Sequence, residues 1–243
     1  MTAFGILGAA VWWPKERQQL ADAELLPTRV RARSSPLTRM LAHVAGDALR
    51  QSGLPPSEVP MIVGSAFGEM DTTCQLLPMC FDSENEFSPA RFQRSVHNAG
   101  IGQLSIVTGN RRFSSAIAAG FNTVPMAFIE AQAWMLGHGG PLLVLFGDEA
   151  LPDSLRQNLQ YGALAAAFVL GTEEPAPLGS IEAVRRRVRP AAGTLSNPEP
   201  WSGNPCASAA HLHRLILDHR DAELVLNPNH QEVAWWLTYR PKA

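Results

Sequence analysis

Phe113-Ser-Ser-Ala-Ile-Ala-Ala-Gly120-Phe-Asn122, the helical pattern of Thr123–Leu136 and the apolar run of Pro141–Glu149 form the most informative part of the sequence. Their order predicts a strand, a sharp turn of small residues, a helix and a second strand. Such a turn holds one residue at the helix N-terminus, where a thiolate or an oxyanion is stabilised. Gly120 stands at that position, so the turn carries no side chain for chemistry.

The composition is that of a globular protein with a full core. The chain has 243 residues, 46% of them hydrophobic and 17% charged, which is enough for one large domain or two small ones. The net charge is −2, so nothing favours nucleic acid as the main partner. Cys74, Cys80 and Cys206 are scattered and odd in number, which argues against a disulfide framework and favours a reducing compartment.

The N-terminal residues indicate a strand rather than a targeting signal. Residues 1–13 are largely apolar but lack a basic start, and the run stops at Pro14 and Lys15. No segment offers about 18 uninterrupted apolar residues, so we expect no membrane span. We therefore expect the protein to work in the cytoplasm.

Apolar strands alternate with helices over the first 170 residues. The predicted buried strands are Phe4–Trp12, Val59–Ser65 and Ala163–Leu170. A helix is expected to begin at Ser35 and Pro36, a favourable N-cap and first helical residue, and to end at Gly53. Pro89–Val107 predicts helix, turn and helix. The alternation predicts an α/β domain built of layers.

The composition changes after Gly171. Glu173–Pro177 is linker-like, and Pro190–Ser208 is rich in proline and predicts loops. The elements predicted beyond residue 171 are a strand at Ile181–Arg189, a helix at His211–Asp218 and a short strand at Leu224–Leu226. We expect residues 1–170 to form one domain and residues 171–243 a short extension that packs on the same core.

Four segments, in this order, resemble the N-terminal half of a β-ketoacyl synthase of the thiolase fold. They are Ile62–Glu69, Ser95–Gly109, Ser114–Gly120 and Gly137–Glu149. The pattern Asn-Ala-Gly-x-x-x-x-Ser-Ile and the closing Gly-Asp-Glu carry most of the likeness. The resemblance implies a thiolase-like αβα half-fold with a truncated, degenerate C-terminal part. Residues 148–153 also resemble short synthase-like proteins of aryl-polyene-type polyketide pathways.

Two departures from active synthases point to a non-catalytic role. Counting back from Gly137, the resemblance places the catalytic Cys at Gly120, and chain-length-factor subunits also lack that Cys. Active synthases use two further histidines in Gly-rich settings, but only 73 positions follow residue 170. The histidines in that part have no Gly-rich flanks: they are His211, His213, His219 and His230.

The resemblance therefore implies a chain-length-factor-like subunit that pairs with an active β-ketoacyl synthase as a heterodimer. Pairing would use the edge strand Phe113–Ile117, as in thiolase-fold dimers. The subunit would complete its partner's fold, wall off a shared acyl tunnel and set polyene length in type II polyketide or fatty-acid-like biosynthesis. An acyl carrier protein is the second expected partner, and no cofactor or metal is expected.

The same resemblance suggests residues for the tunnel. The candidate wall residues are Phe92, Val96, His97, Asn98 and Phe121. An apolar side chain in such a wall limits chain length, because a filled volume accepts no further methylene groups. For the aromatic and aliphatic members an ordinary core role is an equal alternative. His97 and Asn98 equally suit a hydrogen-bonded core pair.

The charge run Arg185-Arg-Arg-Val-Arg189 offers a candidate docking site for a carrier protein. Acyl carrier proteins are acidic, so a basic patch could steer one in. Alternation along a strand would place Arg185, Arg187 and Arg189 on one face. A solvated strand is the alternative explanation.

A stand-alone acyltransferase or thioesterase with another nucleophile is the alternative function. Cys74 and Cys80 are the nearest cysteines in sequence to the turn, although a free cysteine also packs as a small apolar residue. Ser114 and Ser115 precede the turn, but no Gly-x-Ser-x-Gly motif surrounds them. A homodimeric scaffold without an acyl ligand is a third possibility.

Cys206, His211 and His213 suggest a metal site only weakly. On a helix, residues two apart face different sides, and no fourth ligand is evident. An ordinary surface or interface helix explains this segment better.

Overall fold

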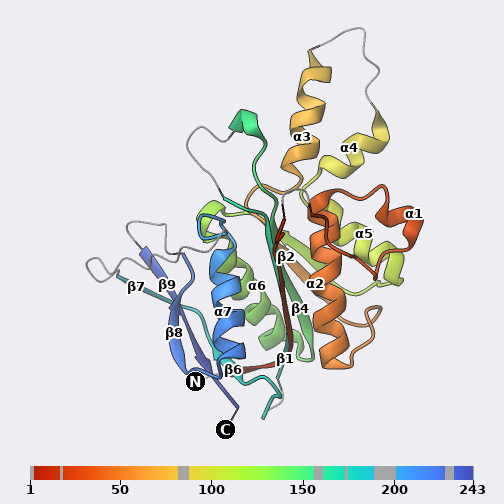
Figure 1. Cartoon of the computed structure of the whole chain (residues 1–243). Helices are drawn as coiled ribbons and strands as arrows, with labels where there is room; N and C mark the ends of the chain where they lie inside the picture. The colour runs from red at the N-terminus through yellow and green to blue at the C-terminus, as the bar shows by residue number, and fades with distance from the viewer. Residues whose placement is uncertain are drawn as a thin grey trace.

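The computed structural model describes residues 3–16, 19–81, 88–155, 161–172, 175–188, 201–227 and 233–242. These residues form one nine-stranded sheet in the order β3-β2-β4-β5-β1-β6-β9-β7, with β8 paired to β9 (Figure 1). The strands are β1 (Ala3–Trp12), β2 (Met61–Gly64), β3 (Ser114–Ile117), β4 (Leu142–Asp148), β5 (Leu164–Gly171), β6 (Ser180–Glu182), β7 (Arg185–Val188), β8 (Ala222–Val225) and β9 (Val233–Arg240). The helices are α1 (Thr28–Arg31), α2 (Pro36–Ser52), α3 (Met70–Leu76), α4 (Pro89–Ser95), α5 (Ala99–Thr108), α6 (Thr123–His138) and α7 (Ala207–Leu217), with short 3-10 turns η1 (Leu77–Cys80), η2 (Gly120–Asn122) and η3 (Asp153–Leu155).

Helices cover both faces of the sheet, which confirms the predicted α/β class and its αβα layers. α2 and α5 lie against one face, and α6 and α7 against the other (Figure 1). On β4, Val144 and Phe146 face the core beneath α6 and α7, whereas Leu145 faces the core beneath α2 and α5. A strand covered on both faces is a continuous apolar run, as β4 is from Leu142 to Phe146. Among the described residues, no helix has both the length and the apolar character needed to cross a membrane.

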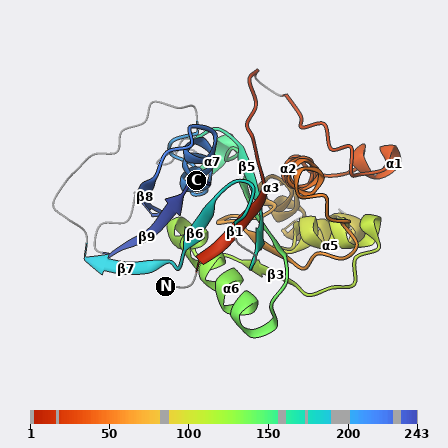
Figure 2. The same cartoon turned by 90° about the horizontal axis from the view of Figure 1, so that it is seen from below.

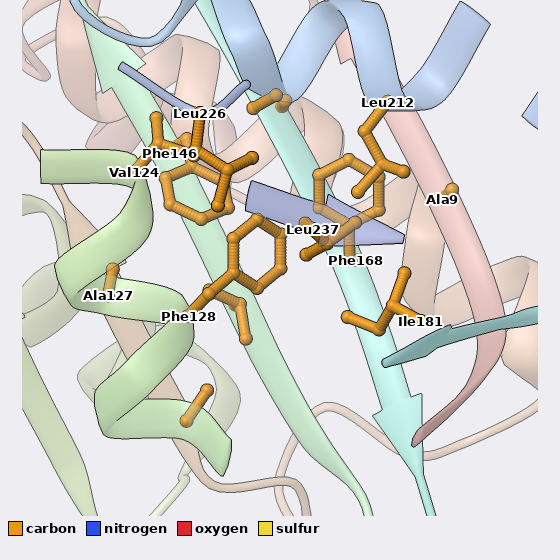
Figure 3. Packing of buried hydrophobic residues seen from close by; sticks show 14 of the residues in the cluster. Ala9, Val124, Ala127, Phe128, Phe146, Phe168, Ile181, Leu212, Leu226 and Leu237 are labelled. Atoms are coloured by element: carbon orange, nitrogen blue, oxygen red, sulfur yellow. The ribbon is translucent and has the colours of Figure 1, made fainter. Parts of the chain in front are cut away.

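Three phenylalanines form the centre of the core beneath α6 and α7. Phe128 of α6 lies with its ring centroid 5.0 Å from that of Phe146 on β4 and 5.9 Å from that of Phe168 on β5. Figure 3 shows these rings between α6 and the strands, with Leu212 of α7 and Leu237 of β9 beside them. Residues beyond position 170 thus contribute to the same core, while the predicted domain division at residue 170 stays a prediction.

The first long helix, α2, has the ends that its sequence predicts. The Ser35 hydroxyl accepts a hydrogen bond from the Thr38 amide at 3.0 Å, and Pro36 is the first helical residue. Gly53 follows the last turn with φ +69°, the left-handed conformation that ends many helices. The two helices predicted within Pro89–Val107 are confirmed as α4 and α5, but the turn predicted over Asn98–Gly102 lies mostly in the first turn of α5, which begins at Ala99.

The predicted strand Ile181–Arg189 is two strands in the structure, because the chain bends between β6 and β7. The side chain of Gln132 on α6 reaches this bend. Its Nε2 donates to the Glu182 carbonyl at 3.2 Å, and its Oε1 accepts from the Val184 amide at 3.0 Å. The side-chain amide of Gln132 therefore provides hydrogen bonds to a carbonyl and an amide of the backbone where the strand is interrupted.

β3 lies at one end of the sheet, in agreement with the edge strand that the resemblance implied, and Figure 2 shows it between α5 and α6. Its parallel partner is β2. The carbonyls of Phe113 and Ile117 accept from the amides of Met61 and Ser65, at 3.0 and 3.1 Å. Alternate residues of a strand point their backbone groups the same way, so Ser114 and Ala116 direct theirs away from β2.

Candidate functional site

Gly120 lies in η2, directly between β3 and α6. The Thr123 side chain closes the turn: its hydroxyl donates to the Gly120 carbonyl at 2.7 Å and accepts from the Ala119 amide at 3.0 Å. Gly120 is exposed and has φ +54°, which an L-residue adopts only with strain. A Cβ at this position would meet no atom within 4 Å. The turn therefore faces open space without offering a nucleophile.

A C-terminal residue fastens this turn to the rest of the sheet. Asn227, next to β8, donates from Nδ2 to the Asn122 side-chain oxygen at 2.9 Å and to the Val233 carbonyl at 2.7 Å. Its own Oδ1 accepts from the Trp235 amide at 2.9 Å. Asn227 is buried, so one amide side chain joins β9 to the strand–helix turn.

A buried polar cluster lies at the carboxyl ends of β2 and β4, and Asp148 is its centre. The Asp148 carboxyl is fully buried and accepts from the amides of Ala66 and Phe67, at 3.0 and 2.9 Å. It also accepts from the Ser65 hydroxyl at 2.8 Å and the Cys206 thiol at 3.3 Å. Burial raises the pKa of Asp148, and these hydrogen bonds oppose that effect.

Cys206 belongs to this cluster and is not a nucleophile. It is fully buried immediately before α7. Burial, together with the neighbouring Asp148 charge, raises the pKa of its thiol well above the ordinary value. The thiolate is the reactive form of cysteine, so this side chain is an inert structural donor.

Two further carboxyl groups are buried where α3 begins. Glu69 accepts from the Thr38 hydroxyl at 2.9 Å, and Glu149 accepts from the Asp71 amide at 2.7 Å. In each, the second oxygen, Oε2, has no hydrogen-bond partner in the part of the chain that the structure describes. Burial raises the pKa of both groups, that of Glu149 to about 8, with the charges of Glu69 and Asp71 adding to the increase for Glu149.

The Glu149→Gln variant should be more stable than the natural protein above pH 8. Because the pKa of Glu149 is raised from 4.5 to about 8, the folded state binds this proton more tightly than the unfolded state. In the natural protein, the contribution of protonated Glu149 to folding stability is complete below about pH 4.5. This contribution is lost as the pH rises through about 8. The amide keeps the acceptor for Asp71 and has no charge to bury, so we expect a gain of about 1–3 kcal/mol at pH 8.5.

Urea unfolding of both proteins between pH 5 and about pH 9 measures this difference. Glu130→Gln removes one half-exposed carboxyl group of α6 and is the matched control for the loss of a single negative charge. Equal pH profiles for the natural protein and Glu149→Gln would contradict the prediction.

The predicted tunnel residues lie on two neighbouring parts of the structure. Phe92 and Val96 are exposed on and just after α4, in the arm formed by α3, η1 and α4 that projects beyond the sheet (Figure 1). His97 bonds through Nε2 to the Ser65 carbonyl at 2.7 Å, which fits the hydrogen-bonded alternative. Asn98 is the exposed N-cap of α5, and Phe121 is half-buried in η2. Their place in an acyl tunnel stays a prediction.

The predicted docking arginines already have acidic partners. Arg185 pairs with Glu182 at 2.8 Å and Arg187 with Glu223 at 2.9 Å. Arg187 also lies over the Trp236 ring, 5.7 Å from its centroid. Arg189 lies outside the described residues. These pairs weaken β7 as a cationic docking surface.

The alternative nucleophiles have no visible activating group. Cys74 is half-buried on α3 and Cys80 exposed on η1. Ser114 and Ser115 lie on β3, and neither hydroxyl contacts a histidine or carboxylate among the described residues. No group of three or more His, Cys, Asp or Glu side chains in those residues is placed to hold a metal. A cavity of about 170 Å³ lies far along the chain from the turn, beside α2, and is lined in part by His43.

Sequence reasoning assigned no role to the cluster around Asp148. The available signal was the Gly-Asp-Glu that follows the apolar run at the end of β4, since a carboxyl group at the end of a buried strand needs buried donors. Ser65, at the end of the neighbouring strand, gave the same signal. Cys206 could not be foreseen, because it reaches Asp148 from 58 positions further along the chain.

Comparisons with known proteins give one family and a consistent set of structures. A model of the beta-ketoacyl synthase N-terminal domain matches residues 8–235. A search of curated proteins gives no match. The ketosynthase ApeO in complex with its chain length factor ApeC, from Xenorhabdus doucetiae, has a TM-score of 0.65 at 21% identity, over 93% of this chain and 84% of the other.

Two further complexes have the same fold. The ishigamide ketosynthase/chain length factor has a TM-score of 0.60 at 18% identity, over 76% of this chain and 67% of that one. AntDE:AntF, a type II acyl carrier protein in complex with its ketosynthase, has a TM-score of 0.60 at 16% identity, over 78% and 70%. At these identities the likeness establishes the shared fold, and the chemistry must be read from the site itself.

Proposed function

Because the chain belongs to the family of β-ketoacyl synthase N-terminal domains, we propose that it is a non-catalytic, chain-length-factor-like subunit of a cytoplasmic β-ketoacyl synthase complex. The turn at Gly120 is the observation that carries this proposal. Covalent condensation needs a nucleophile that holds the acyl chain, and this turn has no side chain in the place where one would serve. The only cysteine in the buried cluster, Cys206, is held protonated by its surroundings.

The proposed partner is an active synthase, joined edge to edge through β3. The outward backbone groups of Ser114 and Ala116 are available for a further strand, because β2 occupies the other side. Phe113, immediately before the strand, is exposed and stacks on Trp134 of α6, with 5.8 Å between the ring centroids. A free strand edge with an exposed aromatic residue at its start is the kind of surface that a further strand can cover.

The pair would enclose an acyl tunnel, with Phe92, Val96, His97, Asn98 and Phe121 in its wall. The supporting observation is placement: Phe92 and Val96 are exposed on the projecting arm, ready to be covered by another chain. The tunnel would limit the length of a polyene or a similar acyl chain. An acyl carrier protein would bring that chain, as such a protein binds its ketosynthase in the AntDE:AntF complex.

Co-expression with a candidate β-ketoacyl synthase tests the pairing. Native mass spectrometry should detect a complex of one copy of each chain, and condensation from malonyl carrier protein should require both. Condensation by this chain alone would refute the proposal, and so would the absence of a complex with any synthase from the same pathway.

The Gly120→Cys variant should not condense acyl chains on its own. A cysteine at φ +54° is strained, and the described residues place no histidine in contact with the turn to assist decarboxylation. We expect the rate of ketoacyl product formation from malonyl carrier protein to stay at the background of the natural chain. Mass spectrometry after exposure to an acyl thioester provides the control, because it shows whether the new thiol is accessible. Measurable condensation without a partner would contradict the non-catalytic assignment.

A further inference from the structure

Two segments that carry five arginines come together where α1 meets the projecting arm. α1 carries Arg29 and Arg31, and Arg33 follows in the next turn. α4 carries Arg91 and Arg94, which are three residues apart and therefore share one side of the helix. Arg94 joins the two parts, because its Nη1 donates to the Arg33 carbonyl at 2.6 Å.

Most of this charge is not neutralised. Arg31 pairs with Asp22 at 2.7 Å. Arg94 donates hydrogen bonds to the carbonyls of Arg33 and Ala90, and its charge opposes the rise that burial causes in the pKa of Glu69, without an ion pair between the two. The side chains of Arg29, Arg33 and Arg91 are exposed and form no ion pair with any residue that the structure describes. We call Arg29, Arg33, Arg91 and Arg94 the α1–α4 basic patch. A patch of one sign on a chain of net charge −2 attracts an acidic partner.

Apolar side chains border the patch. Phe92 is 54% exposed and lies between Arg91 and Arg94 in the sequence of α4, and Val96, just after that helix, is 40% exposed. Arginine together with aromatic residues is typical of protein interfaces, whereas a site for small phosphates needs no such apolar neighbours. The partner is therefore expected to combine acidic and apolar groups on one face.

We propose that the α1–α4 basic patch, rather than β7, is the docking surface for an acidic acyl carrier protein. This inference rests on the proposed function. In Figure 1, α1 and α4 lie on the opposite side of the molecule from β7. The proposed tunnel residues Phe92 and Val96 are on α4 and at its C-cap, next to Arg91 and Arg94 in the chain. A carrier docked here would deliver its acyl chain beside those residues, whereas none of the proposed tunnel residues lies on β7. The β7 arginines are moreover committed to Glu182 and Glu223.

Charge reversal tests the patch directly. The full chain, alone and in its complex with a synthase, is titrated with a fluorescently labelled holo acyl carrier protein of a bacterial type II system. The variant Arg29→Glu/Arg33→Glu/Arg91→Glu should weaken binding at least about tenfold, and raising the salt from about 0.05 to 0.2 M should weaken the natural protein more than the variant. Arg94 is left unchanged because it holds α4 in place.

A second triple variant controls for net charge. Arg186→Glu/Arg220→Glu/Lys242→Glu changes three exposed side chains of the C-terminal part, including the β7 arginine that has no ion pair among the described residues. It should bind the carrier within about twofold of the natural protein. Thermal unfolding of both variants checks that each is folded.

Several results would overturn the inference. These are equal carrier affinity for the patch variant and the natural protein, an equal loss in the control variant, or no carrier binding by a synthase complex that does form. Patch-dependent binding to vesicles of equal parts phosphatidylcholine and phosphatidylglycerol, without carrier binding, would assign the patch to a membrane instead. Failure of the synthase complex to form is a separate result, which refutes the proposed function.

Discussion

Replacing Ala116 with proline should weaken pairing with the synthase at least about 100-fold while the chain itself stays folded. Ala116 lies on the edge strand β3, and its amide points away from β2. Proline removes that donor and places its ring where an incoming strand would approach. No hydrogen bond to β2 is lost, so we expect the free energy of unfolding to change by no more than about 1 kcal/mol.

The neighbouring position supplies the matched control. Ser115 directs its backbone toward β2, so Ser115→Pro removes a hydrogen bond inside the sheet and should destabilise the chain by about 3 kcal/mol. Binding is measured by titrating the labelled chain with purified synthase, and stability by urea unfolding. If Ala116→Pro pairs as tightly as the natural chain, the interface does not use this edge.

Replacing Asp148 with alanine should cost about 3–5 kcal/mol of unfolding free energy, the largest stability effect that we expect of a polar substitution in this chain. Its carboxyl group accepts from two amides, a hydroxyl and a thiol. Alanine leaves these donors buried without an acceptor, and each unsatisfied donor costs about 1–3 kcal/mol. Urea unfolding at pH 7 measures the loss.

Two variants make this result interpretable. Asp148→Asn keeps one oxygen acceptor but turns an NH2 group toward donors, so its loss should fall between that of Asp148→Ala and zero. Asp218→Ala changes an exposed carboxyl group at the end of α7 and should stay within about 0.5 kcal/mol of the natural protein. A loss below 1 kcal/mol in Asp148→Ala would mean that water or a rearranged loop replaces the carboxyl group.

Much of the fold could be predicted because local signals agree with it. Ser35, Pro36 and Gly53 specify the ends of α2 by their own conformations, and the structure has those ends. β1, β2, β4 and β5 have largely apolar sequences because helices cover both faces of the sheet. Their apolar runs therefore indicated strands. These features are determined by residues close together in the sequence, and a sequence pattern can therefore predict them.

The elements that pattern reasoning missed depend on distant contacts. β9 carries Trp235 and Trp236 side by side, which breaks the alternation by which a strand is recognised, and only its pairing with β6, β7 and β8 places it in the sheet. The bend between β6 and β7 is set by Gln132, about 50 positions earlier in the chain. No local signal contains either fact.

The features of the candidate site also separate into those that nearby residues determine and those that depend on contacts between distant residues. Gly120 could be predicted at a strand–helix turn from the residues around it, and the structure places it there. The α1–α4 basic patch could not, because Arg33 and Arg94 are 61 positions apart and meet only in the folded chain. The run around Arg185 was more conspicuous in the sequence, yet two of its arginines are paired internally.

The two ends of the sheet are chemically unlike, and this bears on which edge a second sheet can use. β3 ends the sheet with outward backbone groups, whereas the other end has β7, with three consecutive arginines, and β8, whose Glu223 pairs with Arg187. Charged side chains on a strand edge discourage another strand from adding there. An edge-to-edge partner is therefore expected at β3, and the charges at the far end would limit growth from that side.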